Sequence, residues 1–206
     1  MPPSLQAALA TALWCTWHSF FVTHGWRRFV QRYLVRYQPF ERLVYVLTAT
    51  VTFGALAVWL RGLPQQPVWD WAGGWQVVRF LGLGLALLLF GLGARSYDGR
   101  GFLGLRQIAD RMAGREHRDP PFRSDGILGM IRHPWYTGTL AVLVFALPFT
   151  DVNLAWRGVF LVYTLIGTEL EERKLLADLG ETYAAYRRRV PRFLPGVGGS
   201  ERGDVE

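Results

Sequence analysis

Two clusters of charged and aromatic residues flank one apolar stretch of the chain. The first is Arg132-His133-Pro134-Trp135-Tyr136, and the second is Glu169-Leu170-Glu171-Glu172-Arg173. An arginine, the free amides of a helix start and a hydroxyl suit an anionic group, whereas paired carboxylates suit a cation. If the stretch between the clusters crosses a membrane twice, both lie at the same end of it.

The first cluster has the sequence of a helix start. Proline is favoured at the first position of a helix, and the residue before proline is held out of the helical region. We therefore expect a helix to begin at Pro134, with Arg132 and His133 on its approach and Tyr136 in its first turn. Taken alone, the motif fits equally an interfacial helix start with an arginine–lipid contact.

The glutamate pair is expected at the end of a fifth apolar helix. Neighbouring residues point about 100° apart on a helix, so one carboxylate can face the bundle while the other faces water or pairs with Arg173. Acidic residues at a helix C-terminus oppose the helix dipole, and such an unfavourable placement hints at a function. The alternative is that the helix continues through Lys174 and Leu176. The pair would then be in mid-helix and merely solvated.

Five apolar runs must position these clusters. They are residues 5–24, 43–60, 75–94, 135–150 and 152–168. Half of the 206 residues are hydrophobic and nine are tryptophan, which is too apolar and aromatic for an ordinary soluble domain of this size. The chain is therefore predicted to be an all-α integral membrane protein with about five transmembrane helices and a cytoplasmic C-terminal helical segment.

The charges indicate an orientation. The net charge is +7, and the arginines gather in segments 27–42, 95–134 and 173–192, whereas loops 61–74 and 150–153 carry few. The positive-inside rule then places the N-terminus outside and both clusters in the cytoplasm, in a bacterial inner membrane. Membrane lipid is thus an expected partner, and nucleic acid is not, because no recognisable nucleic-acid module accompanies the charge. Cys15 is the single cysteine, which excludes an intramolecular disulfide and a cysteine metal cluster.

Shorter elements are expected between and after the spans. Residues 105–115 read as a helix on the membrane surface, and another short helix is expected from Glu181, with Tyr183 and Tyr186 as neighbours on one face. Gly82 and Ala86 would permit close contact between helices. We expect one membrane domain over residues 1–206, with three spans in 1–94, a ligand-binding core in 95–195 and a disordered tail in 196–206.

The motifs in combination are far more specific than either alone. In order they are Gly126-Ile127, Arg132-His133-Pro134-Trp135-Tyr136-Thr137-Gly138, an apolar hairpin, Glu171-Glu172, Gly180, Tyr183, Tyr186 and Val190-Pro191. This pattern resembles the isoprenylcysteine carboxyl methyltransferase superfamily, which includes phospholipid N-methyltransferases, and it covers residues 95–195. Gly104-Leu105-Arg106-Gln107 and His18-Ser19-Phe20-Phe21 look more like the branch that holds NnrU-type proteins and methanethiol S-methyltransferases.

The resemblance implies S-adenosylmethionine (SAM) as cofactor at the cytosolic face and methyl transfer to a small or lipophilic acceptor, with no metal needed. It implies catalytic roles for Arg132, Tyr136 and Glu172. Cofactor binding would fall to Leu128, Gly129, Ile131, Arg132, His133, Pro134, Tyr136, Glu171, Glu172 and Tyr183. Substrate contacts would come from His18, Arg106, Gln107 and Thr168.

Two departures bear on the acceptor. Enzymes acting on prenylcysteine carboxylates show an arginine where this chain has Thr168, and an aromatic residue where it has Leu128. A thiol or a lipid amine is therefore favoured over a prenylcysteine carboxylate, and the choice among the three stays open, as does the oligomeric state. The alternative function is that of a non-catalytic, NnrU-like accessory protein. His18 is either functional or a neutral hydrogen-bond partner between helices.

Overall fold

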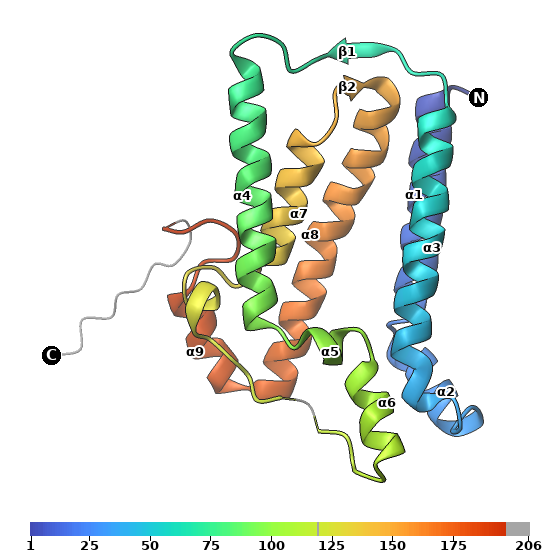
Figure 1. The fold of residues 1–206 in the computed structure, drawn as a ribbon, viewed down its shortest axis with the longest axis vertical. Helices are drawn as coiled ribbons and strands as arrows, with labels where there is room; N and C mark the ends of the chain where they lie inside the picture. The colour runs from blue at the N-terminus through green and yellow to red at the C-terminus, as the bar shows by residue number, and fades with distance from the viewer. Residues whose placement is uncertain (119, 197–206) are drawn as a thin grey trace, which may run out of the picture. The chain divides into compact units, whose positions relative to one another are not determined.

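The computed structural model describes residues 1–118 and 120–196. These residues are predominantly helical, as predicted, with one short two-stranded sheet (Figure 1). In chain order the elements are α1 (Pro3–Phe20), α2 (His24–Tyr33), η1 (Gln38–Phe40), α3 (Glu41–Gly62), β1 (Pro67–Trp69), α4 (Trp75–Ser96), α5 (Gly99–Phe102), α6 (Leu105–Met112), η2 (Gly126–Gly129), α7 (Pro134–Phe145), β2 (Phe149–Thr150), α8 (Asp151–Leu179) and α9 (Glu181–Arg189).

Among the described residues, two helices are long and apolar enough to cross a membrane. One is the helical segment Gln38–Gly62, which contains α3, and the other is α4, while α7 is a shorter apolar helix. They coincide with the second and third predicted spans. Only 6% of the most apolar window of the first segment is buried in the protein, so its side chains face outward. An outward-facing apolar helix suits a lipid environment.

The chain forms two compact units. The first unit contains Met1–Val68, Tyr97–Pro121 and Phe149–Val159, and the second contains Trp69–Ser96, Phe122–Pro148 and the chain from Phe160 onward. Helix α8 contributes to both, because the division falls after Val159. Each unit has its own cluster of buried residues.

In the first unit α1 and α3 lie side by side (Figure 1). Ala7, Leu60 and Val152 form its buried apolar core. Along the helix pair, the Tyr45 hydroxyl lies 2.7 Å from Nε2 of His18. The contact agrees with one of the two interpretations of His18, namely that it forms a hydrogen bond between helices. Helix α1 ends at Phe20, a few residues earlier than expected, and α2 begins separately at His24.

Helix α6 confirms the short helix expected from residue 105, although it ends at Met112. It starts after Gly104, whose φ of +81° suits glycine. A Cβ at Gly104 would also lie 2.7 Å from the backbone nitrogen of Leu43. Glycine is therefore required here both by conformation and by the close approach of α3.

In the second unit α4 packs along α7 (Figure 1). A Cβ on Gly82 would lie 2.2 Å from the Phe145 ring, and one on Gly93 would lie 2.4 Å from the Trp135 ring. The predicted close helix contact through small residues is thus confirmed. At one end of the pair, Arg79 of α4 donates to the carbonyls of Phe145, the last residue of α7, and of Ala146, its C-cap. This arginine satisfies carbonyls that a helix C-terminus leaves unpaired.

The region that carries the site differs from expectation in one important respect. Helix α7 begins at Pro134, as predicted, but α8 continues to Leu179. The prediction that Glu171 and Glu172 end the fifth helix is therefore wrong. The following residues, Arg173 to Leu179, are mostly good helix formers, and the first strong breaker is Gly180, with φ of +56°. The short helix expected from Glu181 is confirmed as α9. The tail expected from residue 196 lies almost wholly outside the described residues.

Candidate functional site

The carboxylate of Glu172 is the centre of a buried polar cluster in the second unit. Its side chain is completely buried, and it lies about two turns before the end of α8. Arg132 donates from Nε to Oε1 at 2.9 Å, and Nε2 of His133 lies 3.1 Å from the same oxygen. Arg192 donates from Nη2 to Oε2 at 2.7 Å. The alternative was right that the helix continues through Lys174 and Leu176. It was wrong that the pair is merely solvated, because Glu172 is buried and enclosed by hydrogen-bonding side chains.

These partners keep Glu172 ionised. Burial opposes its charged form, but hydrogen bonds from His133, Arg192 and Arg132 outweigh burial and lower its pKa from 4.5 to about 2. A buried charge is tolerated only when it is paired and hydrogen-bonded, as this one is. Glu172 therefore aligns two guanidinium groups and an imidazole around a fixed negative charge.

The backbone that follows α9 holds the approach to α7 in place. The amide nitrogen of Arg132 donates to the carbonyl of Pro191 at 2.9 Å, and that of His133 donates to the carbonyl of Arg192 at 3.2 Å. The Thr137 hydroxyl donates to the carbonyl of Phe193 at 3.1 Å. The Arg132 side chain, only 7% exposed, also donates to the carbonyls of Arg187 and Val190. The orientation of the Arg132 guanidinium is therefore fixed by Glu172 on α8 and by the backbone carbonyls at the end of α9.

A polar stripe on α8 leads to this cluster. Thr164, Thr168 and Glu172 are spaced four residues apart and therefore share one helix face, and all three are buried. The Thr168 hydroxyl donates to the carbonyl of Thr164 at 2.7 Å. Thr168 thus lies one turn from Glu172, where the related carboxyl methyltransferases resembled by this chain would have an arginine.

Two tyrosines from α9 line the cluster. Tyr186 donates its hydroxyl to the carbonyl of Leu128 in η2 at 2.7 Å, which ties η2 to α9. Tyr183 is 1% exposed, and within residues 1–118 and 120–196 its hydroxyl has no hydrogen-bond partner. Burial, together with the charge of Glu172, raises the pKa of Tyr183 to about 12. Its proton is therefore fixed, and its hydroxyl is available as a donor.

Other predicted cofactor residues border the same cluster. Ile131 and Pro134 are buried, Tyr136 is half-buried, and Gly129 is exposed. The Tyr136 ring lies 5.4 Å from the His133 ring, centre to centre. Glu171 is half-buried, and no described residue forms an ion pair with it. One of the two adjacent glutamates is thus fully engaged, and the other keeps an uncommitted charge.

Three predicted substrate residues belong to the first unit, whereas the Glu172 cluster belongs to the second. Arg106 forms an ion pair with Asp98, with Nε and Oδ2 3.0 Å apart. Gln107 donates to the carbonyl of Gly101, and His18 contacts Tyr45. Thr168 alone of the four lies beside Glu172 in sequence and packing.

Arg192 was not identified from the sequence, and Glu169 was named in the second cluster without being assigned a role. Arg192 bridges Glu169 and Glu172, since its Nη2 lies 2.8 Å from Oε2 of Glu169 and 2.7 Å from Oε2 of Glu172. Glu169 and Glu172 are three residues apart and therefore point to the same side of α8. The spacing of Glu169 and Glu172 could have indicated that both carboxylates share one ligand. From the sequence, only the adjacent pair Glu171 and Glu172 was considered. Arg192 gave no local signal, because its role depends on the chain turning back after α9.

Comparison with known proteins gives a consistent result. A methanethiol S-methyltransferase of Mycobacterium tuberculosis is 30% identical over 189 residues, which are 86% of this chain and 72% of that protein. One from Pseudomonas deceptionensis is 32% identical over 77% of this chain and 61% of its own length. One from Pseudomonas sp. strain GM41(2012) is 29% identical over 93% of this chain and 73% of its own.

The chain is shorter than these relatives, and it spans 58% to 74% of the lengths of those compared. No family model and no solved structure matches it. The curated relatives nevertheless share one printed name, and their similarity extends over most of this chain. Both the predicted branch and the predicted methyltransferase character are confirmed at the level of the family. On this similarity, and on the motif cluster around Glu172, the chain belongs to the methanethiol S-methyltransferase family.

Proposed function

We propose that this protein is an integral-membrane, SAM-dependent methyltransferase that methylates a small thiol. The observation that carries the proposal is the fully buried Glu172, which is held ionised by Arg132, His133 and Arg192. Burial of these charged groups costs free energy, and clusters of this kind are frequent at functional sites, where they hold charged groups in a fixed arrangement. The names of the relatives support the reaction class and favour a thiol over the other acceptors.

The residues around Glu172 fit the charges of the cofactor. SAM carries a sulfonium and an ammonium group, which need a carboxylate, and a carboxylate, which needs donors. Glu171 offers the uncommitted negative charge, since within the described chain it forms no ion pair. Tyr183 offers an unpartnered hydroxyl inside the cluster. Glu172 in this proposal is a positioning residue, and Glu171 is the residue that meets the cationic part of SAM.

The chain needs to do little covalent chemistry. Bound SAM supplies an already activated methyl group, which is transferred by in-line displacement. Arg132 and His133 are rigid, because their backbones and side chains are bonded on several sides. A rigid arrangement lowers the barrier by orienting the reactants and by matching the change in charge. The thiol acceptor releases one proton for each methyl group that it receives.

The wider architecture is part of the proposal. We place five spans in the bilayer, with the N-terminus outside and the Glu172 cluster at the cytoplasmic face, in one membrane domain. The arginine-rich segments 27–42, 95–134 and 173–192 support this orientation. An acceptor that is small and apolar would reach the site from the lipid.

Titration of the full-length protein with SAM tests the cofactor, and conversion of methanethiol to dimethyl sulfide tests the reaction. We expect saturable SAM binding and SAM-dependent release of dimethyl sulfide. Prenylcysteine and phosphatidylethanolamine serve as competing acceptors, and faster methylation of either would overturn the choice of a thiol. A folded protein that binds no SAM would overturn the enzyme proposal itself.

A matched pair of variants tests the assignment of Glu171. Glu171→Gln removes the uncommitted charge and should weaken SAM binding about tenfold, in line with the loss of one charged hydrogen bond. Asp178→Asn removes an exposed acid two turns further along α8 and should leave binding unchanged. Equal effects of the two variants would show that only the general charge of the region matters.

A further inference from the structure

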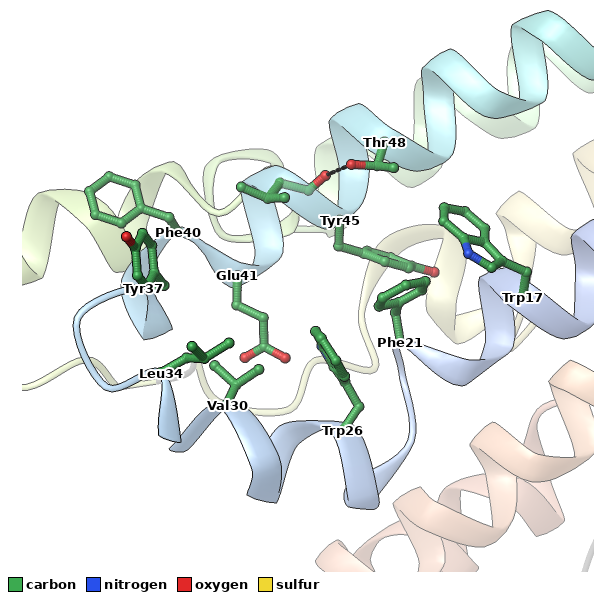
Figure 2. Close-up of a pocket in the computed structure, with 11 residues that line it drawn as sticks. Trp17, Phe21, Trp26, Val30, Leu34, Tyr37, Phe40, Glu41, Tyr45 and Thr48 are labelled. Atoms are coloured by element: carbon green, nitrogen blue, oxygen red, sulfur yellow. Dashed lines mark hydrogen bonds between the residues drawn. The ribbon is translucent and has the colours of Figure 1, made fainter. Parts of the chain in front are cut away.

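The first unit contains a pocket that the proposed reaction does not use. It has a volume of about 270 Å³. This is close to the lower end of the range for ligand pockets, roughly 300 Å³, so the pocket suits only a small ligand. It lies between the end of α1, helix α2, η1 and the start of α3 (Figure 2). Most of its lining is aromatic, from Trp17, Phe21, Trp26, Tyr37, Phe40 and Tyr45.

The aromatic walls are held in fixed positions. The rings of Trp17 and Phe21 meet edge to face at 4.8 Å, and those of Phe21 and Trp26 do so at 5.0 Å. The Tyr45 hydroxyl is fixed by His18, at 2.7 Å from Nε2. Edge-to-face pairs are favourable arrangements, and they hold these three rings in place beside the pocket. The pocket is therefore preorganised.

One carboxylate enters this aromatic lining. Figure 2 shows the side chain of Glu41 directed toward Val30 and Trp26. No residue of the described ranges forms an ion pair with Glu41, although Arg27 acts on it electrostatically. An acid on an apolar wall would be a poor choice for an acyl chain. It is a suitable choice for a cation, which aromatic faces also attract.

We propose that this pocket binds an organic onium group, meaning an alkylated ammonium or sulfonium cation. The aromatic faces would surround the alkyl substituents, and Glu41 would supply the opposite charge. Aromatic cages recognise quaternary ammonium in this way, because the ring faces are negative and the methyl groups are apolar. The onium group can belong to a free molecule or to the headgroup of a lipid. The inference is independent of the Glu172 cluster, which lies in the other unit.

Titration of the full-length protein in a neutral maltoside detergent tests the pocket, with the fluorescence of its tryptophans as readout. Choline is the probe, and 3,3-dimethylbutan-1-ol is the control, because it has the same shape without the charge. We expect saturable binding of choline, at least tenfold tighter than that of the alcohol. Equal binding of both, or no saturable response to choline, would overturn the proposal.

Variants locate the effect. Glu41→Gln should weaken choline binding about tenfold and leave the alcohol unchanged, whereas Arg27→Gln should strengthen choline binding by removing a competing cation. Trp26→Leu, a second variant that keeps the charge, should weaken choline binding as well. Glu116→Gln removes an acid outside the pocket, 83% exposed, and should change nothing. Full choline affinity in Glu41→Gln would overturn the proposal.

The source of the cation is tested in nanodiscs. In discs of phosphatidylglycerol, free choline should bind as it does in detergent. If lipid headgroups occupy the pocket, discs of phosphatidylcholine should lower the apparent affinity for choline at least tenfold by competition. Equal affinity in both discs would support a free cation as the ligand. Loss of choline binding in both kinds of disc would contradict an onium site in the membrane-embedded protein.

Discussion

At the scale of residues, the two adjacent glutamates have different surroundings. Glu172 is buried and bonded to Arg132, His133 and Arg192, whereas Glu171 is half-buried and keeps its charge uncommitted. Their different directions on α8 follow from helix geometry alone. The tertiary structure decides that Glu172, and not Glu171, contacts Arg132 and Arg192.

Removal of the Glu172 charge should destabilise the protein. Glu172→Gln leaves Arg132 and Arg192 close together without their shared carboxylate, and breaking a buried ion pair in this way costs about 3–5 kcal/mol. We expect a lower thermal midpoint, measured by tryptophan fluorescence in detergent. Glu171→Gln is the matched control and should keep the wild-type midpoint. Equal midpoints for the wild type and Glu172→Gln would contradict the structural role.

The same carboxylate predicts a dependence of stability on pH. The folded pKa of Glu172 is lowered from 4.5 to about 2, so its contribution is complete above pH 4.5 and is lost as the pH falls toward 2. The thermal midpoint of the wild-type protein should therefore fall within this window. Glu172→Gln should lack this part of the fall. A parallel decline in both proteins would assign the acid sensitivity to other groups.

At the scale of elements, contact between α4 and α7 depends on small residues at fixed intervals. A Cβ on Gly82 would lie 2.2 Å from the Phe145 ring, whereas one on Gly84, two residues on, meets nothing within 4 Å. The periodicity of α4 therefore separates one face that must stay small from another that is free.

This difference gives a paired prediction on one helix. Alanine is the better helix former by about 1 kcal/mol, so Gly84→Ala should preserve or raise stability. Gly82→Ala forces the Phe145 ring or α7 to move and should cost about 1–3 kcal/mol. Thermal unfolding of the two variants in detergent measures both effects. A Gly82→Ala protein as stable as Gly84→Ala would show that α7 yields readily.

At the scale of the whole molecule, the proposed orientation can be tested by labelling. Cys15 is buried and is the only cysteine, so a Cys15→Ala background allows single cysteines to be introduced. Gly74→Cys, in the loop before α4, should react with a membrane-impermeant maleimide on intact cells. Met112→Cys, at a position that is 83% exposed, should react only after the membrane is opened. The reverse pattern would invert the topology and place the Glu172 cluster outside the cytoplasm.

Much of this protein follows from its sequence alone. The apolar runs predicted the helices, because apolar segments of this length are stable as helices in lipid. Pro134 predicted the start of α7, because proline suits the first position of a helix, and the ordered motifs predicted the family. Local rules sufficed for each of these. The end of α8 was placed too early, because the favoured interpretation ended the helix at the glutamate pair although no strong breaker precedes Gly180.

Only the tertiary structure decided which side chains contact Glu172. Arg192 lies 20 residues from Glu172 and binds it only because α9 and the chain after it turn back toward α7. The aromatic pocket around Glu41 likewise needs α1, α2 and α3 to meet. Such contacts join segments far apart in the chain, and no periodicity or local propensity encodes them. The sequence determined which residues could do chemistry, and long-range packing decided which of them meet.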